Sequence, residues 1–251
     1  MFTSISLKLQ NGIFSRQGHF IPRWPTCPKI AIFGPPNVFK EEISIRMAID
    51  LGVPILQPDN LILDAAKKFE TDPNFNHPFF QWIHDKVKNN DGEAILKEKI
   101  LLKLLKLDPS YHDGFILNDC PNSMHEALMM EDYKGGLNAF IHLSLPAEIL
   151  VEIEASKVKC ADCHKVYYKN DIIADEHGIY IEKFMPHDGH CDDCSGTHFI
   201  DGSDPAKFEQ DLEAYQRNKD ELLSFYNNNG VLVDFELKKG YESYDKLKRT
   251  L

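Results

Sequence analysis

The sequence predicts an α/β fold, in which helices pack against a β-sheet. Three short apolar runs, at residues 30–33, 115–117 and 140–145, have the length and composition of buried strands. Helical patterns separate these runs, and the densest of them, over residues 92–106, has the leucine content of a helix packed on a sheet. Alternation of strands and helices along a chain is typical of an α/β domain.

Length and charge limit what the chain can be. Its 251 residues, 43% of them hydrophobic, are enough for one large domain or two small ones with a real core. The 39 acidic residues outnumber the 28 basic ones and give a net charge of −11, which disfavours nucleic acid as a partner. Because no stretch approaches ~18 uninterrupted apolar residues, we expect no transmembrane segment.

The amino-terminal segment has the opposite charge character. Residues 1–28 contain Lys8, Arg16 and Arg23 and no acid, and the first carboxylate of the chain is Glu41. Basic, hydroxyl-bearing and acid-free termini are typical of organelle import sequences. The segment therefore indicates a mitochondrial location, with cytoplasmic and ciliary locations as alternatives. A docking arm against another subunit and a solvated tail are the other interpretations of this segment.

A glycine-started loop follows the first predicted strand. The run Gly34-Pro-Pro-Asn-Val-Phe-Lys40 lies between that strand and a helical pattern, which is the layout of a phosphate-binding loop. Gly34 and Lys40 are the candidate phosphate contacts. We expect the ring of Phe39 to lie where a phosphate would sit, and Glu41 and Glu42 to repel an anion. An ordinary strand–turn–helix is the alternative.

The cysteines predict a metal site. Two C-x-x-C pairs lie 27 residues apart, and four thiolates in this pattern form a closed tetrahedral site for a structural Zn²⁺: Cys160, Cys163, Cys191 and Cys194. Two disulfides or four idle thiols are the alternatives. Cys27 and Cys120 lie outside the pattern, and we expect both to be packing residues.

The ordered set of motifs resembles the adenylate kinase family, in its long form with a zinc-carrying lid. The resemblance runs from about Lys29 to the carboxyl terminus, and its segments are Gly34-Pro-Pro, Leu51-Gly-Val-Pro54, Gln57-Pro-Asp-Asn60, the run 114–121, the run 140–148 and the closing helix and strand from Asp211 to about residue 232. It implies a P-loop nucleoside-monophosphate-kinase fold, a parallel sheet flanked by helices with a zinc-carrying lid insert.

The resemblance also implies a division of the chain. Residues 1–28 are the basic arm, and residues 29–156 are a core that contains a nucleoside-monophosphate-binding arm at about 57–88. The zinc lid is residues 157–198, and residues 199–251 return to the core with the closing helices and the last strand.

Most positions that do chemistry in the family are changed here. Lys157 is the one cation left at the base of the lid, and the remaining changed positions are Leu63, Asn118, Asn122, Asp201 and Asp211, of which Asn118 replaces the Mg²⁺-ordering aspartate and the others replace arginines. Lysine cannot reproduce the bidentate phosphate contact of arginine, and an acid reverses its charge. The resemblance is therefore to a pseudo-adenylate-kinase, in which Gly34, Lys40 and Lys157 are vestigial nucleotide contacts.

The resemblance implies three alternative functions. The first, by analogy with related nucleotide-kinase folds that are accessory subunits of respiratory and ciliary assemblies, is a catalytically inactive or nearly inactive accessory subunit of a larger assembly, mitochondrial and of the respiratory chain. Its partners would be protein subunits, and residues 1–28 would be a docking segment. This function uses Zn²⁺ as a structural metal and does not require ATP or Mg²⁺. The second is a working kinase that transfers a phosphoryl group from ATP to a nucleoside monophosphate. The third is a sensor that binds a nucleotide without turnover.

Overall fold

The structure is a computed structural model, and it describes residues 27–71, 77–89, 103, 105–106, 111–133, 135–186 and 188–251. The arm at residues 1–26 and most of the helix predicted over 92–106 lie outside the described residues. The monophosphate arm expected at 57–88 is described except for residues 72–76. Within the described residues, no helix combines the length and the apolar character that crossing a membrane requires.

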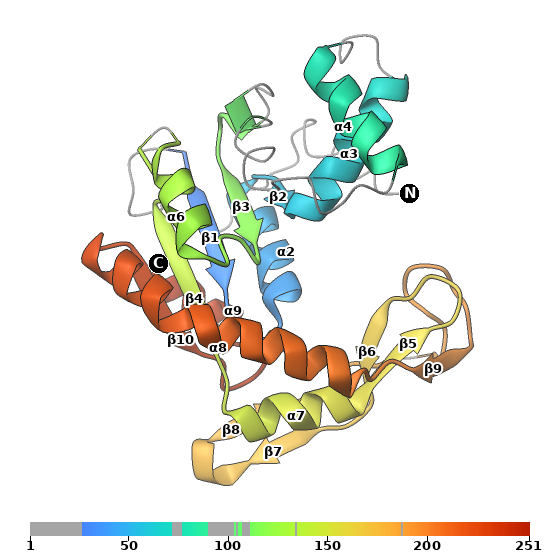
Figure 1. Cartoon of the computed structure of the whole chain (residues 1–251). Helices are drawn as coiled ribbons and strands as arrows, with labels where there is room; N and C mark the ends of the chain where they lie inside the picture. Colours follow the sequence, from blue (N-terminus) through green and yellow to red (C-terminus); the bar gives the residue numbers. More distant parts are fainter. Residues whose placement is uncertain are drawn as a thin grey trace, which may run out of the picture.

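A five-stranded parallel sheet forms the centre of the molecule (Figure 1). Its strand order is β10-β4-β1-β3-β2, and the strands are β1 (Lys29–Phe33), β2 (Ile55–Leu56), β3 (Phe115–Asn118), β4 (Ala139–Ser144) and β10 (Leu232–Glu236). The three apolar runs of the sequence correspond to β1, β3 and β4, so the α/β prediction is confirmed. Every strand pair in this sheet is parallel.

Both faces of the sheet are buried. On β1, Ile30 and Ile32 belong to one core cluster, whereas Ala31 and Phe33 belong to the other. Because successive side chains of a strand point to opposite faces, an uninterrupted apolar strand needs helices on both sides. The first face is covered by α2 (Lys40–Leu51), α7 (Ala147–Ser156) and α9 (Tyr244–Thr250), and the second by α6 (Met124–Glu131). The helix α8 (Pro205–Asn228) contributes Phe208 to the first cluster and Leu222 and Tyr226 to the second.

Two projections leave this core (Figure 1). The first is a helical hairpin of α3 (Pro58–Thr71) and α4 (Pro78–Lys88), which has its own small core around Phe80 and Ile83. The second contains a three-stranded sheet and a hairpin, and its elements are β5 (Lys157–Cys160), β6 (Val166–Tyr168), β7 (Ile172–Ala174), the 3₁₀ helix η4 (Asp175–His177), β8 (Ile179–Ile181) and β9 (Phe199–Asp201).

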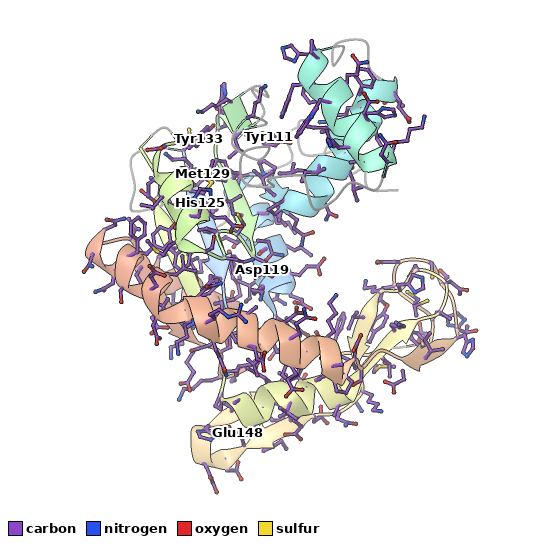
Figure 2. The ribbon with its side chains drawn as sticks, in the orientation of Figure 1. Tyr111, Asp119, His125, Met129, Tyr133 and Glu148 are labelled. Carbon is purple, nitrogen blue, oxygen red and sulfur yellow. The ribbon has the colours of Figure 1, made fainter. Side chains whose placement is uncertain are left out.

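Only part of the second projection stands away from the core. Ile172, Ile179 and Ile181 of the β7–β8 hairpin belong to the main core cluster with α2, α7 and α9. His177 Nε2 lies 2.9 Å from a carboxylate oxygen of Glu148, at the start of α7 beside the hairpin (Figure 2). The lid expected at 157–198 therefore consists of a hairpin fixed to the core and a sheet that carries the cysteines.

The two cysteines outside the C-x-x-C pattern differ in their exposure to solvent. Cys120 is buried in the core cluster that contains α6, in agreement with a packing role. Cys27 is exposed, so the expectation that it packs is wrong. Its place explains the exposure, because it precedes β1 at the rim of the sheet, where the side chain meets solvent.

Ile141 in the central strand β4 tests the packing of the sheet. It is fully buried, and Ile141→Ala is expected to lower the free energy of unfolding by about 2–5 kcal/mol because it leaves a cavity that close-packed neighbours cannot fill. The measurement is urea denaturation. Ile173→Ala is the matched control: Ile173 is 61% exposed on β7, and its replacement is expected to change stability by less than about 0.5 kcal/mol.

Candidate functional site

The loop between β1 and α2 has two non-glycine residues in the left-handed region. Asn37 has φ of 67° and Phe39 has φ of 56°. Glycine is the usual residue at such positions, and a side chain there costs roughly 1–2 kcal/mol, although Asn tolerates the conformation better than Phe. The loop thus has the tight turns that glycines would provide, at a cost in strain that its surroundings must offset.

Phe39 offsets that strain by packing. Its side chain is only 4% exposed and lies in the main core cluster. Its ring lies edge-on to Tyr168 of β6 at 5.4 Å and 6.3 Å from the ring of Tyr241. The expectation that this ring occupies the phosphate position is corrected: the left-handed backbone turns the ring into the core, where it joins β6 to the loop before α9.

Lys40 is bound by its own loop. Its Nζ donates to the carbonyl oxygens of Gly34 at 2.7 Å and Pro35 at 2.9 Å, and lies 3.1 Å from a carboxylate oxygen of Asp119. An ammonium group has three N–H donors. All three are therefore engaged within the protein, and the side chain is 14% exposed. Asp119, directly after β3, is a partner that sequence reasoning did not identify.

Two carboxylates occupy the start of α2. Glu41 and Glu42 lie in its first turn, where the helix dipole favours negative charge. Burial raises the pKa of Glu42, and Glu41 beside it acts in the same direction, while a backbone hydrogen bond and Lys157 oppose the shift without cancelling it. The helix start that could attract a phosphate thus already carries its own anions.

A buried carboxylate joins the loop to the second projection. Glu154 of α7 is 5% exposed. One of its oxygens accepts from Lys157 Nζ at 2.6 Å and from Asn37 Nδ2 at 2.9 Å, and the other accepts from the backbone N–H of Asp204 at 2.7 Å. Burial by itself raises the pKa of Glu154, but these hydrogen bonds outweigh it and lower the pKa overall.

The four predicted cysteines converge. Their sulfur atoms lie within 4.8 Å of one another, with Cys160 and Cys191 buried and Cys163 and Cys194 exposed. The closest sulfurs are 3.4 and 3.5 Å apart, far beyond the ~2.05 Å of a disulfide. Zn–S bonds of ~2.3 Å in a tetrahedron place sulfurs about 3.8 Å apart, so the cluster has the dimensions and the donor set of a closed zinc site.

The two cysteine turns have the same shape. In each, the residue after the second cysteine is left-handed, His164 with φ of 62° and Ser195 with φ of 61°. Its N–H donates to the carbonyl of the first cysteine, at 3.0 Å in one turn and 2.8 Å in the other. Each turn directs both of its sulfurs to one point, which is the geometry that a four-thiolate site requires.

The chain is similar to curated adenylate kinases over most of its length. It is 22% identical over 222 residues to the adenylate kinase of Kosmotoga olearia, which covers 82% of this chain and 90% of that protein. It is 25% identical over 212 residues to the adenylate kinase of Allorhizobium ampelinum, an alignment that covers 81% of this chain and 89% of that protein. It is 27% identical over 224 residues to the adenylate kinase of Limosilactobacillus fermentum, which covers 87% of this chain and 94% of that protein. No protein-family model matches the chain.

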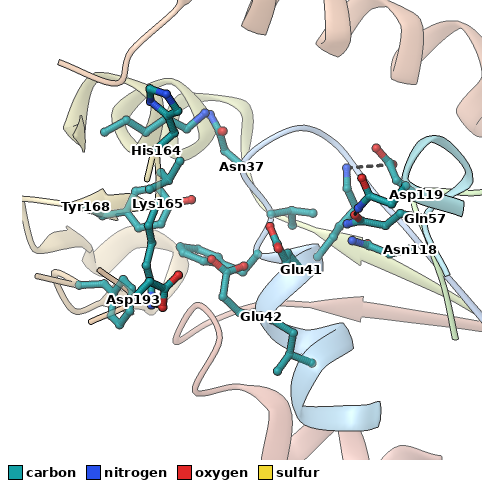
Figure 3. A pocket seen from close by; sticks show the side chains of 18 of the residues that line it. Asn37, Glu41, Glu42, Gln57, Asn118, Asp119, His164, Lys165, Tyr168 and Asp193 are labelled. Atoms are coloured by element: carbon teal, nitrogen blue, oxygen red, sulfur yellow. Dashed lines mark hydrogen bonds and ion pairs between the residues drawn. The ribbon is translucent and has the colours of Figure 1, made fainter. Parts of the chain in front are cut away.

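The chain is an adenylate-kinase-like protein. Its parallel sheet, its phosphate loop and its two projections form the P-loop nucleoside-monophosphate-kinase fold of that family. A cleft with a volume of about 1500 Å³ lies beside the phosphate loop and extends from the loop and α2 to both cysteine turns (Figure 3).

The structure brings some predicted residues to this cleft. Lys40, Asn118, Asn122 and Lys157 line it. The others are not among its described lining residues: Gly34, Leu63, Asp201 and Asp211. Leu63 is 46% exposed on α3, and both aspartates are exposed, one at the end of β9 and one on α8. Asp201 and Asp211, where the resemblance implies that an acid replaces an arginine, are therefore not among the described residues that line the cleft.

Sequence reasoning missed residues that the cleft depends on. Glu154 was missed because its helix reads as an ordinary apolar pattern, and nothing in the pattern distinguishes a buried glutamate from an exposed one. Asp119 had a usable signal, since it is a polar residue directly after a buried strand, where the carboxyl ends of parallel strands form ligand sites.

The cysteine cluster predicts a measurable metal content. We expect the purified chain to carry about one zinc ion and Cys160→Ser to lose it, because a closed site has no spare ligand. Elemental analysis of the purified protein measures both. Cys27→Ser is the control, as Cys27 is exposed and outside the cluster, and its zinc content is expected to match the unmodified chain. Equal zinc in both variants would contradict the assignment.

Glu154 predicts a pH-dependent stability. Because its folded pKa lies below the usual value of 4.5, its contribution is complete above about pH 4.5 and is lost as the pH falls through the lower folded value. At neutral pH, Glu154→Gln is expected to cost about 1–3 kcal/mol of unfolding free energy. The difference from the unmodified chain should shrink as the pH falls below about 4.5.

The control for this prediction is Glu152→Gln, an exposed carboxylate on the same helix. Denaturant unfolding at a series of pH values compares the two variants. A loss at Glu154→Gln that does not depend on pH, or an equal loss at Glu152→Gln, would show that the carboxylate charge is not what holds the loop.

Proposed function

We propose that this adenylate-kinase-like chain does not transfer phosphoryl groups and serves as a structural accessory subunit of a larger mitochondrial assembly, a respiratory-chain complex. The observation that carries the proposal is the state of Lys40, whose three donors are taken by Gly34, Pro35 and Asp119. A phosphate must displace Asp119 and the loop carbonyls before it meets this cation. Glu41 and Glu42 oppose that exchange, because they place two more negative charges at the same helix start.

The other cations of the cleft support the same conclusion. Lys157 is held at 2.6 Å by the buried Glu154, and Lys165 lies 2.7 Å from Asp193. Phosphoryl transfer depends on cations that are free to meet the charge developing in the transition state, and losing one such donor typically costs ~10²–10³ in rate. With each described lysine of the cleft paired with a carboxylate, little of the usual rate enhancement would remain.

A working adenylate kinase is the second candidate. It is favoured by the name of the similar proteins and by the presence of Lys40 at the end of the phosphate loop. In that function Lys40 would leave Asp119 for the β- and γ-phosphates of ATP. The two candidates therefore differ in whether ATP can break the Lys40–Asp119 ion pair.

A coupled assay for ADP formation from ATP and AMP decides between them. We expect the zinc-replete chain to show no turnover above its Lys40→Ala variant, and calorimetric titration with ATP to show no saturable binding. Turnover that disappears with Lys40→Ala would overturn the proposal in favour of a kinase. Saturable ATP binding without turnover would overturn it in favour of a nucleotide sensor.

The zinc in this proposal is structural, since four protein thiolates leave no open coordination position. The metal would keep the two cysteine turns rigid, so that they present a constant surface. The mitochondrial assignment is supported by the basic, acid-free segment 1–28.

An accessory subunit is expected to co-migrate with a large complex when solubilised mitochondrial membranes are separated on a native gel. Detection of the chain only as a free monomer, or only outside mitochondria, would contradict the assembly or the location respectively.

A further inference from the structure

We propose that the cleft beside the phosphate loop binds the basic amino-terminal segment of its own chain, residues 1–26. The inference rests on the proposed function, because a cleft that holds this segment cannot hold ATP at the same time. It assigns an occupant to a site that the charges make unsuitable for a polyphosphate.

The cleft has a surplus of negative charge. Its described lining residues include three lysines, Lys40, Lys157 and Lys165, and each is paired with a carboxylate. Among the described residues that line it, six are carboxylates: Glu41, Glu42, Asp119, Glu126, Asp192 and Asp193. A concave, partly desolvated surface of one sign concentrates ligands of the opposite sign, so this cleft favours a cation.

Three acceptor side chains of the cleft have room for further donors. Within the described residues, neither Glu41 nor Glu42 forms an ion pair, and only the more distant charge of Lys157 acts on Glu42. Asn118 is 5% exposed, and its buried Oδ1 has no hydrogen-bond partner. Figure 3 shows Glu41 and Glu42 in the middle of the hollow, with Asn118 and Asp119 on one side of them and His164 and Lys165 on the other. Carboxylates and an amide oxygen call for N–H donors, which lysine and arginine supply.

The chain has a segment with the matching chemistry. Residues 1–26 contain Lys8, Arg16 and Arg23 and no acid, although the chain as a whole has a net charge of −11. The described structure begins at Cys27, just before β1. The segment is thus joined to the sheet that carries the cleft, so binding within one chain has a high effective concentration.

The length of the segment decides which residues reach the cleft. Cys27 and Gly34 are seven residue steps apart, and because β1 between them is extended, the phosphate loop lies about 23 Å along the strand from the segment. Arg23 is tethered within ~13 Å of Cys27 and falls short, whereas Arg16 at up to ~36 Å and Lys8 at up to ~63 Å can reach. Lys8 and Arg16 are therefore the expected contacts, and Arg23 is an internal control.

Zero-length carbodiimide cross-linking of the full-length chain tests the contact. The reagent joins a lysine ammonium to a carboxylate only where they touch. We expect peptide mass spectrometry to find Lys8 joined to Glu41 or Glu42, and this product to disappear in E41Q/E42Q. It should persist in E209Q/E213Q, which removes two exposed carboxylates of α8 outside the cleft.

Proteolysis of the full-length chain measures the same contact without cross-linking. Chymotrypsin cleavage after Phe14, between the two contact residues, is expected to accelerate about fivefold or more in E41Q/E42Q and in K8Q/R16Q, because the loss of ion pairs releases the segment. R23Q should leave the rate unchanged. Since K8Q/R16Q alters only the segment, it gives an answer even if E41Q/E42Q is less stable.

Three outcomes would overturn the inference. They are Lys8 joined only to carboxylates outside the cleft, an equal effect of R23Q and K8Q/R16Q, and cross-links between isotopically distinct copies, which would make the occupant a second chain. All of these measurements are made without nucleotide. ATP turnover by the untreated chain, with the Lys8 cross-link still found when nucleotide is absent, would overturn the proposed function alone. An absent cross-link with no turnover would overturn the segment's docking alone.

Discussion

The buried carboxylate of Glu154 joins three parts of the chain that the sheet does not connect. It accepts from the phosphate loop through Asn37, from the base of the cysteine-bearing sheet through Lys157, and from the turn before α8 through Asp204. A buried charge is costly unless it is fully paired, so these three donors must stay in place together. The position of the loop relative to the second projection, and with it the shape of the cleft, depends on this group.

The phosphate loop has the left-handed backbone conformations typical of glycines at two positions that carry side chains. Asn37 and Phe39 adopt left-handed conformations, and each has a compensation: Asn37 donates to Glu154 and to the carbonyl of Leu150, and Phe39 buries its ring against Tyr168. Burying an aromatic side chain contributes about 2–3 kcal/mol, which exceeds the ~1–2 kcal/mol cost of the left-handed backbone. The loop is therefore stabilised by contacts with the rest of the fold.

The charges of the cleft differ from those that a polyanion-binding site requires. Its described lysines are paired with carboxylates, Glu41 and Glu42 form no ion pair with a described residue, and the buried Oδ1 of Asn118 has no hydrogen-bond partner. The two cysteine turns on its far wall together have the geometry of a closed metal site, and a metal bound there would stabilise the turns without an open position for catalysis. The proposed accessory role and the proposed occupant rest on the same electrostatic observation, since both require a cleft that does not favour phosphate.

The sequence by itself determined the features that depend on local pattern. The apolar runs at β1, β3 and β4 and the two C-x-x-C pairs were recognisable because strand burial and zinc-knuckle spacing are encoded over a few residues. The tertiary structure alone decided that the Phe39 ring enters the core, that Lys40 is bound by Asp119, and that Glu154 is buried. Each of these depends on residues brought together from distant parts of the chain, and burial of a single polar side chain leaves no periodic signal in the sequence.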